Sequence, residues 1–141
     1  MIEAYQHEGE GYNPYIIREG WQVAQLNYVK EQDILNMHKM DKHHHTDEVF
    51  ILLKGTAILI AAKEENDDFQ FECVRMQPAI TYNIPVNQWH NIAMGKDAQL
   101  IIVEKENTHK GDYEYKLLNN EQKDVLDAQI SKYIKNHGQG K

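Results

Sequence analysis

Apolar and polar residues alternate along short stretches through most of this chain. The pattern is clearest over residues 69–76, where Phe69, Phe71 and Cys73 are separated by polar residues. Such alternation is typical of a β-strand with one face in a core and the other in solvent. Glycine and proline separate several strand-like runs, so the pattern predicts a small β-barrel or sandwich. The other runs lie at residues 21–29, 34–40, 49–53, 56–62, 80–84, 89–94 and 99–103.

One of these runs is apolar on both faces. Because side chains alternate along a strand, Val49, Ile51 and Leu53 share one face and Phe50 and Leu52 share the other. One set can fill the barrel, and the other set then needs a cover. A second subunit would supply that cover, so the run predicts a homodimer.

Helical spacing of apolar residues occurs near the C-terminus. Asn119 followed by Gln122 resembles a capping box, and Gly138 is a stop signal. The pattern predicts a helix over roughly residues 120–136, packed on the barrel through its apolar face. The apolar positions at this spacing are Val125, Leu126, Ile130, Tyr133 and Ile134.

The chain divides into three parts by pattern. Residues 1–20 are expected to form an N-terminal arm, with a short strand at residues 15–17, since glycine, asparagine and proline recur there. The barrel is expected over residues 21–118, and the helix and a tail over residues 119–141.

Length and charge narrow the class of protein. At 141 residues the chain fits one domain, and its net charge of −7 argues against binding nucleic acid or an anionic membrane surface. The polar N-terminus lacks an apolar signal region, and no stretch reaches the length of a membrane span, so we expect a cytoplasmic protein. The single cysteine, Cys73, sits at a core position of its strand and predicts packing rather than redox chemistry.

Candidate chemistry gathers just before the run at residues 49–53. Imidazole and carboxylate groups are ligands for divalent transition metals, and a neighbouring strand gives them a stiff support. The groups in this segment are His43, His44, His45, Asp47 and Glu48. A second segment places a lone histidine, His90, at the start of another apolar run, after Pro85.

The first segment resembles the first motif of the cupin superfamily. That motif reads Gly, five residues, His, one residue, His, three or four residues, Glu, six residues, Gly. His43, Glu48 and Gly55 fit its second half. Asp41 stands at the position of the first histidine and Leu35 at that of the leading glycine, so the chain departs from the motif at both.

The second segment resembles the second cupin motif, which reads Gly, five residues, Pro, one residue, Gly, two residues, His, three residues, Asn. Pro85 and His90 fit. Ala79 and Asn87 stand at the glycine positions, and Met94 stands at the asparagine position. The resemblance covers roughly residues 21–104. Over this range the chain is similar to small single-domain bacterial cupins with degenerate motifs.

The resemblance implies a fold and a metal site. The fold would be an all-β, jelly-roll β-barrel, here followed by the C-terminal α-helix. Cupins usually bind metal through three histidines and one glutamate, which leaves His43, Glu48 and His90 in this chain. Such a set suits a divalent metal ion, namely Fe, Zn, Mn or Ni. Asp41 is either a fourth ligand or a solvated carboxylate.

The implied ligand is a small polar molecule, a sugar or a carboxylic acid, bound inside the barrel. The reaction would be an isomerisation, an epimerisation or an oxygenation, with Glu48 or His90 as the catalytic acid or base. The expected ligand pocket contains Asp41, His45, Phe50, Trp89 and Met94.

Two other interpretations remain open from the sequence. In the first, the protein is a metal-free binding or sensing cupin without catalysis. In the second, it is a structural dimer with a vestigial pocket. In the metal-free case His43 and His90 would only form hydrogen bonds with Glu48. Histidines in loop-like sequence, such as His44 and His109, are expected at the surface.

The spacing of His43 and Glu48 makes a structural prediction. They are an odd number of residues apart, so plain strand alternation would point them to opposite faces. A turn or bulge at Thr46 and Asp47 is therefore expected to reset the register and bring both side chains to one site.

Overall fold

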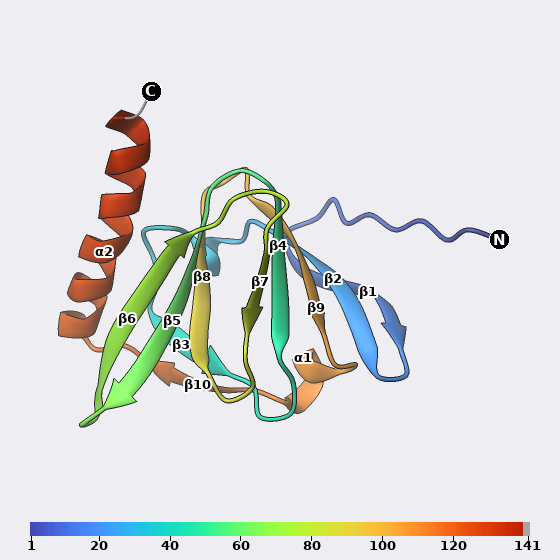
Figure 1. Ribbon diagram of the computed structural model, residues 1–141, viewed down its shortest axis with the longest axis horizontal. Helices are drawn as coiled ribbons and strands as arrows, with labels where there is room; N and C mark the ends of the chain where they lie inside the picture. The colour runs from blue at the N-terminus through green and yellow to red at the C-terminus, as the bar shows by residue number, and fades with distance from the viewer. Residues whose placement is uncertain (140–141) are drawn as a thin grey trace.

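Two five-stranded antiparallel sheets face each other in the computed structural model, which describes residues 1–139 (Figure 1). Sheet A contains, in spatial order, β1 (Gly11–Arg18), β2 (Trp21–Asn27), β9 (Gln99–Glu104), β4 (Glu48–Lys54) and β7 (Thr81–Ile84). Sheet B contains β10 (Glu114–Leu117), β3 (Lys39–Lys42), β8 (Trp89–Met94), β5 (Ala57–Glu65) and β6 (Asp68–Arg75). Three helices complete the described chain: η1 (Lys30–Gln32), α1 (Thr108–Gly111) and α2 (Asn120–Gln139). The fold is a jelly-roll β-barrel with a C-terminal helix, as predicted.

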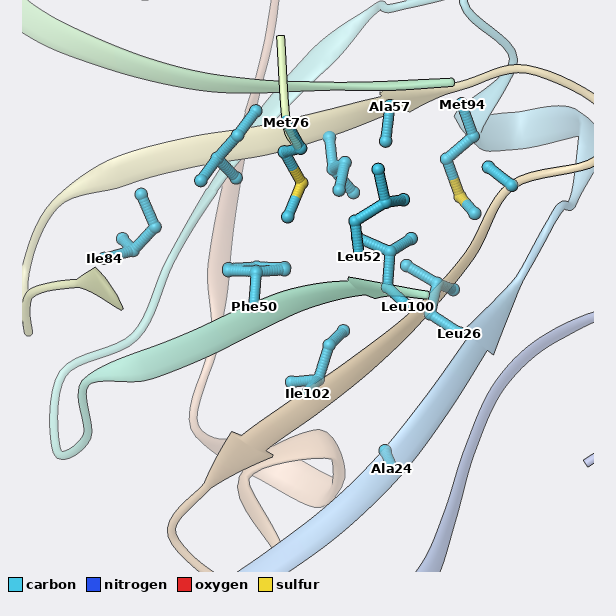
Figure 2. Close-up of a cluster of buried hydrophobic side chains, with 13 residues drawn as sticks. Ala24, Leu26, Phe50, Leu52, Ala57, Met76, Ile84, Met94, Leu100 and Ile102 are labelled. Carbon is cyan, nitrogen blue, oxygen red and sulfur yellow. The ribbon is translucent and has the colours of Figure 1, made fainter. Parts of the chain in front are cut away.

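Side chains from both sheets fill the interior of the barrel (Figure 2). Strand β4 shows how the sequence pattern produces this core. Phe50 and Leu52 are each 2% exposed, whereas Val49 and Ile51 on the other face are only half-buried. Burying one such side chain stabilises the fold by about 1.5–3 kcal/mol. The cluster also contains Ala24, Leu26, Ala57, Leu59, Met76, Ile84, Ile92, Met94, Ala98, Leu100 and Ile102.

Helix α2 packs on the outer face of sheet B, as the C-terminal pattern predicted. The expected capping box is present: Asn119 Oδ1 accepts from Gln122 N (2.8 Å), and Gln122 Oε1 accepts from Asn119 N (2.9 Å). Leu126 and Ile130 are fully buried against this face. The helix continues one residue past Gly138, so the expected stop at that glycine was wrong.

The N-terminal region contains more strand than expected. The sequence predicted an arm with a short strand at residues 15–17, but β1 spans Gly11–Arg18 and pairs with β2. The register shifts between Pro14 and Ile16. β1 is an edge strand, which is the position in a sheet where proline is tolerated. Residues 1–10 precede this strand without helix or strand.

Turns at three motif positions adopt left-handed backbone conformations. Gly55 has φ of +84°, and a Cβ there would lie 2.6 Å from the Cα of Ala98, so only glycine fits. Ala79 and Asn87, which stand at the two glycine positions of the second motif, have φ of 69° and 66°. The departures from the motif therefore keep its backbone geometry, with asparagine tolerating that conformation better than alanine.

In the part of the chain that the structure describes, no helix combines the length and the apolar character that crossing a membrane requires.

Candidate metal centre

The polypeptide brings three distant residues to one end of the barrel. His43 directly follows β3 of sheet B, Glu48 begins β4 of sheet A, and His90 lies in β8 next to β3. The chain bends at His44 and His45 as it passes between the two sheets. This break in regular structure resets the register as expected, although the bend precedes Thr46 and Asp47.

The three side chains converge on one carboxylate oxygen. Glu48 Oε1 lies 3.1 Å from His43 Nε2 and 2.8 Å from His90 Nε2. One potential ligand atom from each residue lies within 4.8 Å of the other two. Glu48 and His90 are buried, with exposed fractions of 6% and 4%. Among the described residues, these three are the histidine, cysteine or acidic side chains that lie close enough together to share a metal ion.

Backbone carbonyls fix the orientation of both imidazoles. A carbonyl oxygen can only accept, so His43 Nδ1–H donates to Asp112 O (2.6 Å) and His90 Nδ1–H donates to Gln88 O (2.9 Å). Each Nε2 atom is thereby turned toward Glu48. A hydrogen bond from the second ring nitrogen is the usual support of a metal-binding histidine. The donor set therefore fits a divalent cation held by two imidazoles and a carboxylate.

Glu48 and the two histidines set one another's charge. Burial disfavours charge on His43, but the hydrogen bond to Glu48 and its negative charge outweigh burial and raise the pKa of His43 to about 9. The pKa of His90 is raised for the same reasons, again against the effect of burial. Burial would raise the pKa of Glu48, yet the hydrogen bonds from both histidines lower it. Without metal, the raised pKa values favour a proton on both Nε2 atoms, each facing the buried carboxylate of Glu48.

A small cavity lies against this group. Its volume is about 180 Å³, below the ~300–1,000 Å³ of pockets for drug-sized ligands, so it suits a small molecule. The lining contains no lysine or arginine. Its residues are Tyr12, Leu26, Gln32, Asp41, His43, Glu48, Phe50, His90, Asn91, Ile92, Ile102, Glu104, Thr108 and His109.

Two oxygen atoms of lining residues are buried without a hydrogen-bond donor among the described residues. They are Oδ1 of Asp41 and Oε1 of Gln32. Lys39 Nζ lies 3.5 Å from Asp41 Oδ1, which gives a long ionic contact rather than a hydrogen bond. Asp41 pairs in register with His90, so it lies beside the candidate metal ligands. Unsatisfied buried acceptors are costly, and a ligand with hydroxyl or amine donors would satisfy them.

A second polar group lies in the cavity. Tyr12 OH donates to Glu104 Oε2, and Gln22 Nε2 donates to the same oxygen (3.3 Å) and lies 3.2 Å from His109 Nδ1. Gln22 is fully buried, and its Oε1 accepts from Asn107 N (2.8 Å), which ties the α1 segment to the barrel. Burial and the nearby charge of Glu48 raise the pKa of Glu104 to about 7, although Tyr12 and Gln22 oppose this.

Sequence reasoning missed this second group. His109 was expected at the surface, and it lines the cavity instead. One signal was available for Glu104: it continues the alternation of Leu100 and Ile102, so its side chain shares their interior face. The partners Tyr12 and Glu104 lie 92 residues apart, and no motif connects them.

The structure divides the expected pocket residues into two sets. Asp41 and Phe50 line the cavity. Trp89 does not, because it precedes His90 in β8 and its side chain points to the opposite face, 5.8 Å from Phe69 between ring centroids. Met94 shares the interior face but lies deeper, fully buried in the barrel core.

His45 also lies outside the cavity. It is exposed, as is His44, and the backbone N–H groups of both donate to the carboxylate of Asp112 (2.9 and 2.8 Å). Because Asp112 O also accepts from His43, this aspartate holds the whole bend in place. His44 and His45 are thus surface residues on a bend that positions His43.

Comparisons with known proteins establish the fold. No protein-family model matches the sequence, and neither does any curated protein. KdgF from Halomonas sp. matches with a TM-score of 0.50 and 12% identity over 77% of this chain and 92% of that chain. Oxalate decarboxylase from Lactobacillus farciminis matches with a TM-score of 0.50 and 16% identity, over 79% of this chain but only 32% of that chain. A cupin-2 domain containing protein from Shewanella frigidimarina matches with a TM-score of 0.49 and 19% identity, over 73% and 85%.

These likenesses, the jelly-roll topology and the two motifs agree. The chain has a cupin-type jelly-roll fold, which it shares with KdgF and oxalate decarboxylase. At these identities the likeness concerns the fold alone, so the activity must be argued from the residues of the cavity.

Proposed function

We propose that this protein is a metal-binding cupin that holds a small hydroxyl-bearing ligand in its cavity. The convergence of His43 Nε2, His90 Nε2 and the Glu48 carboxylate carries the proposal. Two imidazoles and one carboxylate with further positions open are typical of Fe(II) sites, and Zn, Mn and Ni also accept these ligands. A divalent cation bound there would act as a Lewis acid toward an oxygen of the ligand.

The chemistry of the lining favours a sugar-like ligand over a carboxylic acid. Asp41 Oδ1 and Gln32 Oε1 are buried acceptors that need donors, and hydroxyl groups supply them. Apart from the proposed metal ion, the lining offers no lysine or arginine to bind a free carboxylate or phosphate. A small neutral polyhydroxy compound therefore meets the needs of the cavity best.

Proton transfer is the reaction type that the residues support. Beside the proposed metal ligands, the cavity has a pair of groups able to carry protons, Tyr12 and Glu104. A carboxyl group with a pKa of about 7, such as that of Glu104, can both accept and donate a proton near neutral pH. This arrangement supports isomerisation or epimerisation of the ligand.

A metal-free binding protein is the alternative. It is favoured by one observation, namely that protonated His43 and His90 already satisfy Glu48 through short hydrogen bonds. In that case the cavity would bind its ligand without catalysis.

Metal analysis of three variants separates these functions. We expect His43→Ala and His90→Ala each to abolish stoichiometric metal binding by protein purified without a nickel column, because each removes one of three ligands. The matched control His44→Ala removes an exposed imidazole and should change the free energy of metal binding by well under ~1 kcal/mol. Equal loss in all three variants, or loss in His44→Ala alone, contradicts the site.

The ligand class is tested by calorimetric titration of the metal-loaded protein. We expect at least one of a set of neutral monosaccharides to bind to wild type. The same sugar should bind at least about tenfold more weakly to Asp41→Ala, because this variant lacks an acceptor oxygen. Oxalate serves as the comparison ligand. Binding of oxalate with no response to any monosaccharide would contradict the proposed class while leaving the metal site intact.

The expected homodimer stays a prediction. On the outer face of β4, Val49 and Ile51 are half-buried within sheet A, and Leu53 is 47% exposed. The face is therefore apolar and partly accessible.

A further inference from the structure

Strand β10 (Glu114–Leu117) forms one edge of sheet B and carries unusually exposed apolar side chains. Within residues 1–139, β3 is the only strand that pairs with it (Figure 1). Tyr115 and Leu117 in the strand are 57% and 65% exposed, and Tyr113 directly before it is 51% exposed. An edge strand with exposed apolar residues is a template for pairing with another strand.

The register of β10 shows which backbone groups face outward. Leu118 N donates to His38 O, and Glu114 and Lys116 lie opposite Lys42 and Met40 in the same ladder. Hydrogen-bonded residues alternate along an antiparallel pair. The N–H and C=O groups of Tyr115 and Leu117 therefore point away from β3, toward the open edge.

The sequence of this edge is self-complementary. If a second β10 pairs antiparallel about Tyr115, then Tyr115 lies opposite its own copy and Tyr113 lies opposite Leu117. The backbone groups of Tyr115 and Leu117 face outward, so the Tyr115 pair can exchange its N–H···O bonds and the Tyr113–Leu117 pairs can extend the ladder. In the same register Glu114 lies opposite Lys116 twice, on the other face of the ribbon.

We propose that two copies of this chain associate through β10, in antiparallel register centred on Tyr115, so that their two B sheets become one continuous sheet. Backbone hydrogen bonds supply the attraction. The Glu114–Lys116 pairs across the interface select the register. The aromatic and apolar pairs cover the face that carries Tyr115.

The groups that the pairing uses are available in the single chain. Lys116 Nζ contacts Glu64 Oε2, and Glu114 Oε1 lies 3.4 Å from His44 Nε2. Both contacts are at the surface, where ion pairs contribute little and can be shared with a new partner. The outer face of β4 is the other apolar surface, but nothing in the structure shows what covers it.

Charge reversal tests the register directly, and analytical ultracentrifugation measures the association. A short edge gives a small interface and weak association, so the concentration series should extend to about 1 mM. Glu114→Lys places lysine opposite lysine, and Lys116→Glu places glutamate opposite glutamate. We expect each variant to dimerise at least about tenfold more weakly than wild type. An equimolar mixture of the two restores opposite charges, so it should form the mixed dimer.

Two controls keep the result interpretable. Glu64→Gln removes the intrachain partner of Lys116 without changing β10 and should leave association unchanged. Leu53→Glu alters the outer face of β4 and should also leave dimerisation unchanged. Circular dichroism of each variant checks folding. A wild type that stays monomeric over the whole range, a mixture that fails to associate, or dimerisation lost in Leu53→Glu but kept in Glu114→Lys would each overturn the proposal.

Discussion

At the scale of single residues, the candidate site separates into a part that local sequence reveals and a part that it hides. His43, Glu48 and His90 were predicted because a motif places them at fixed spacings, and the structure brings them together. Glu104 and Tyr12 were missed because their pairing depends on how β1, β2 and β9 stack in sheet A. A motif records spacing along the chain, whereas a cavity wall is made by distant segments.

The same scale explains why two predicted pocket residues lie elsewhere. Trp89 and His90 are neighbours in β8, so their side chains must face opposite sides of sheet B. Met94 shares the face of His90 but stands two side-chain positions deeper, in the apolar core. Face and depth both follow from strand register, which the sequence alone left undetermined.

At the scale of secondary structure, elements with strong local signals were predicted and weakly marked elements were not. Helix α2 was found because its cap and apolar spacing agree with each other. Strand β1 was underestimated because Gly11 and Pro14 are residues of turns, and only an edge position permits that proline. Strand β10 is four residues long with every side chain exposed, so no burial pattern marks it.

Helix α2 provides a stability prediction at this scale. Leu126→Ala should lower the free energy of unfolding by about 2–5 kcal/mol, because it opens a cavity between the helix and sheet B where the leucine is fully buried. Thermal and denaturant unfolding measure the effect. Val125→Ala is the matched control on the same turn, since Val125 is 47% exposed, and it should cost less than about 1 kcal/mol. Equal effects of the two substitutions would contradict the docking of the helix.

At the scale of the whole molecule, the candidate metal centre joins the two sheets at one end of the barrel. Glu48 belongs to sheet A, while His90 belongs to sheet B and His43 continues from it. Apolar side chains such as Leu52, Met94 and Leu100 fill the core of the barrel between the sheets (Figure 2). The barrel thus has a polar end, where the candidate metal centre lies, and an apolar part that holds the sheets together, and we expect the charges of the polar end to contribute to stability.

That contribution makes the stability of the metal-free protein depend on pH. The pKa of His43 is raised from 6.5 to about 9 in the folded state, so folding favours its protonated form. The stabilisation is fully present below pH 6.5 and is lost as pH rises through about 9. After allowance for solvent screening of this half-buried group, we expect a loss of about 1–2 kcal/mol. Glu48→Gln removes the charge that holds the proton, so the stability difference between wild type and Glu48→Gln should shrink between pH 6 and pH 9.5.

Denaturant unfolding in the presence of a chelator, at several pH values, measures that difference. Val125→Ala serves as the control, because Val125 is 47% exposed and has no titratable group, and its difference from wild type should stay constant over the same range. The sign of the trend is the decisive observation. If the difference in the free energy of unfolding between wild type and Glu48→Gln widens or stays fixed as pH rises, protonated imidazoles do not hold the two sheets together at Glu48.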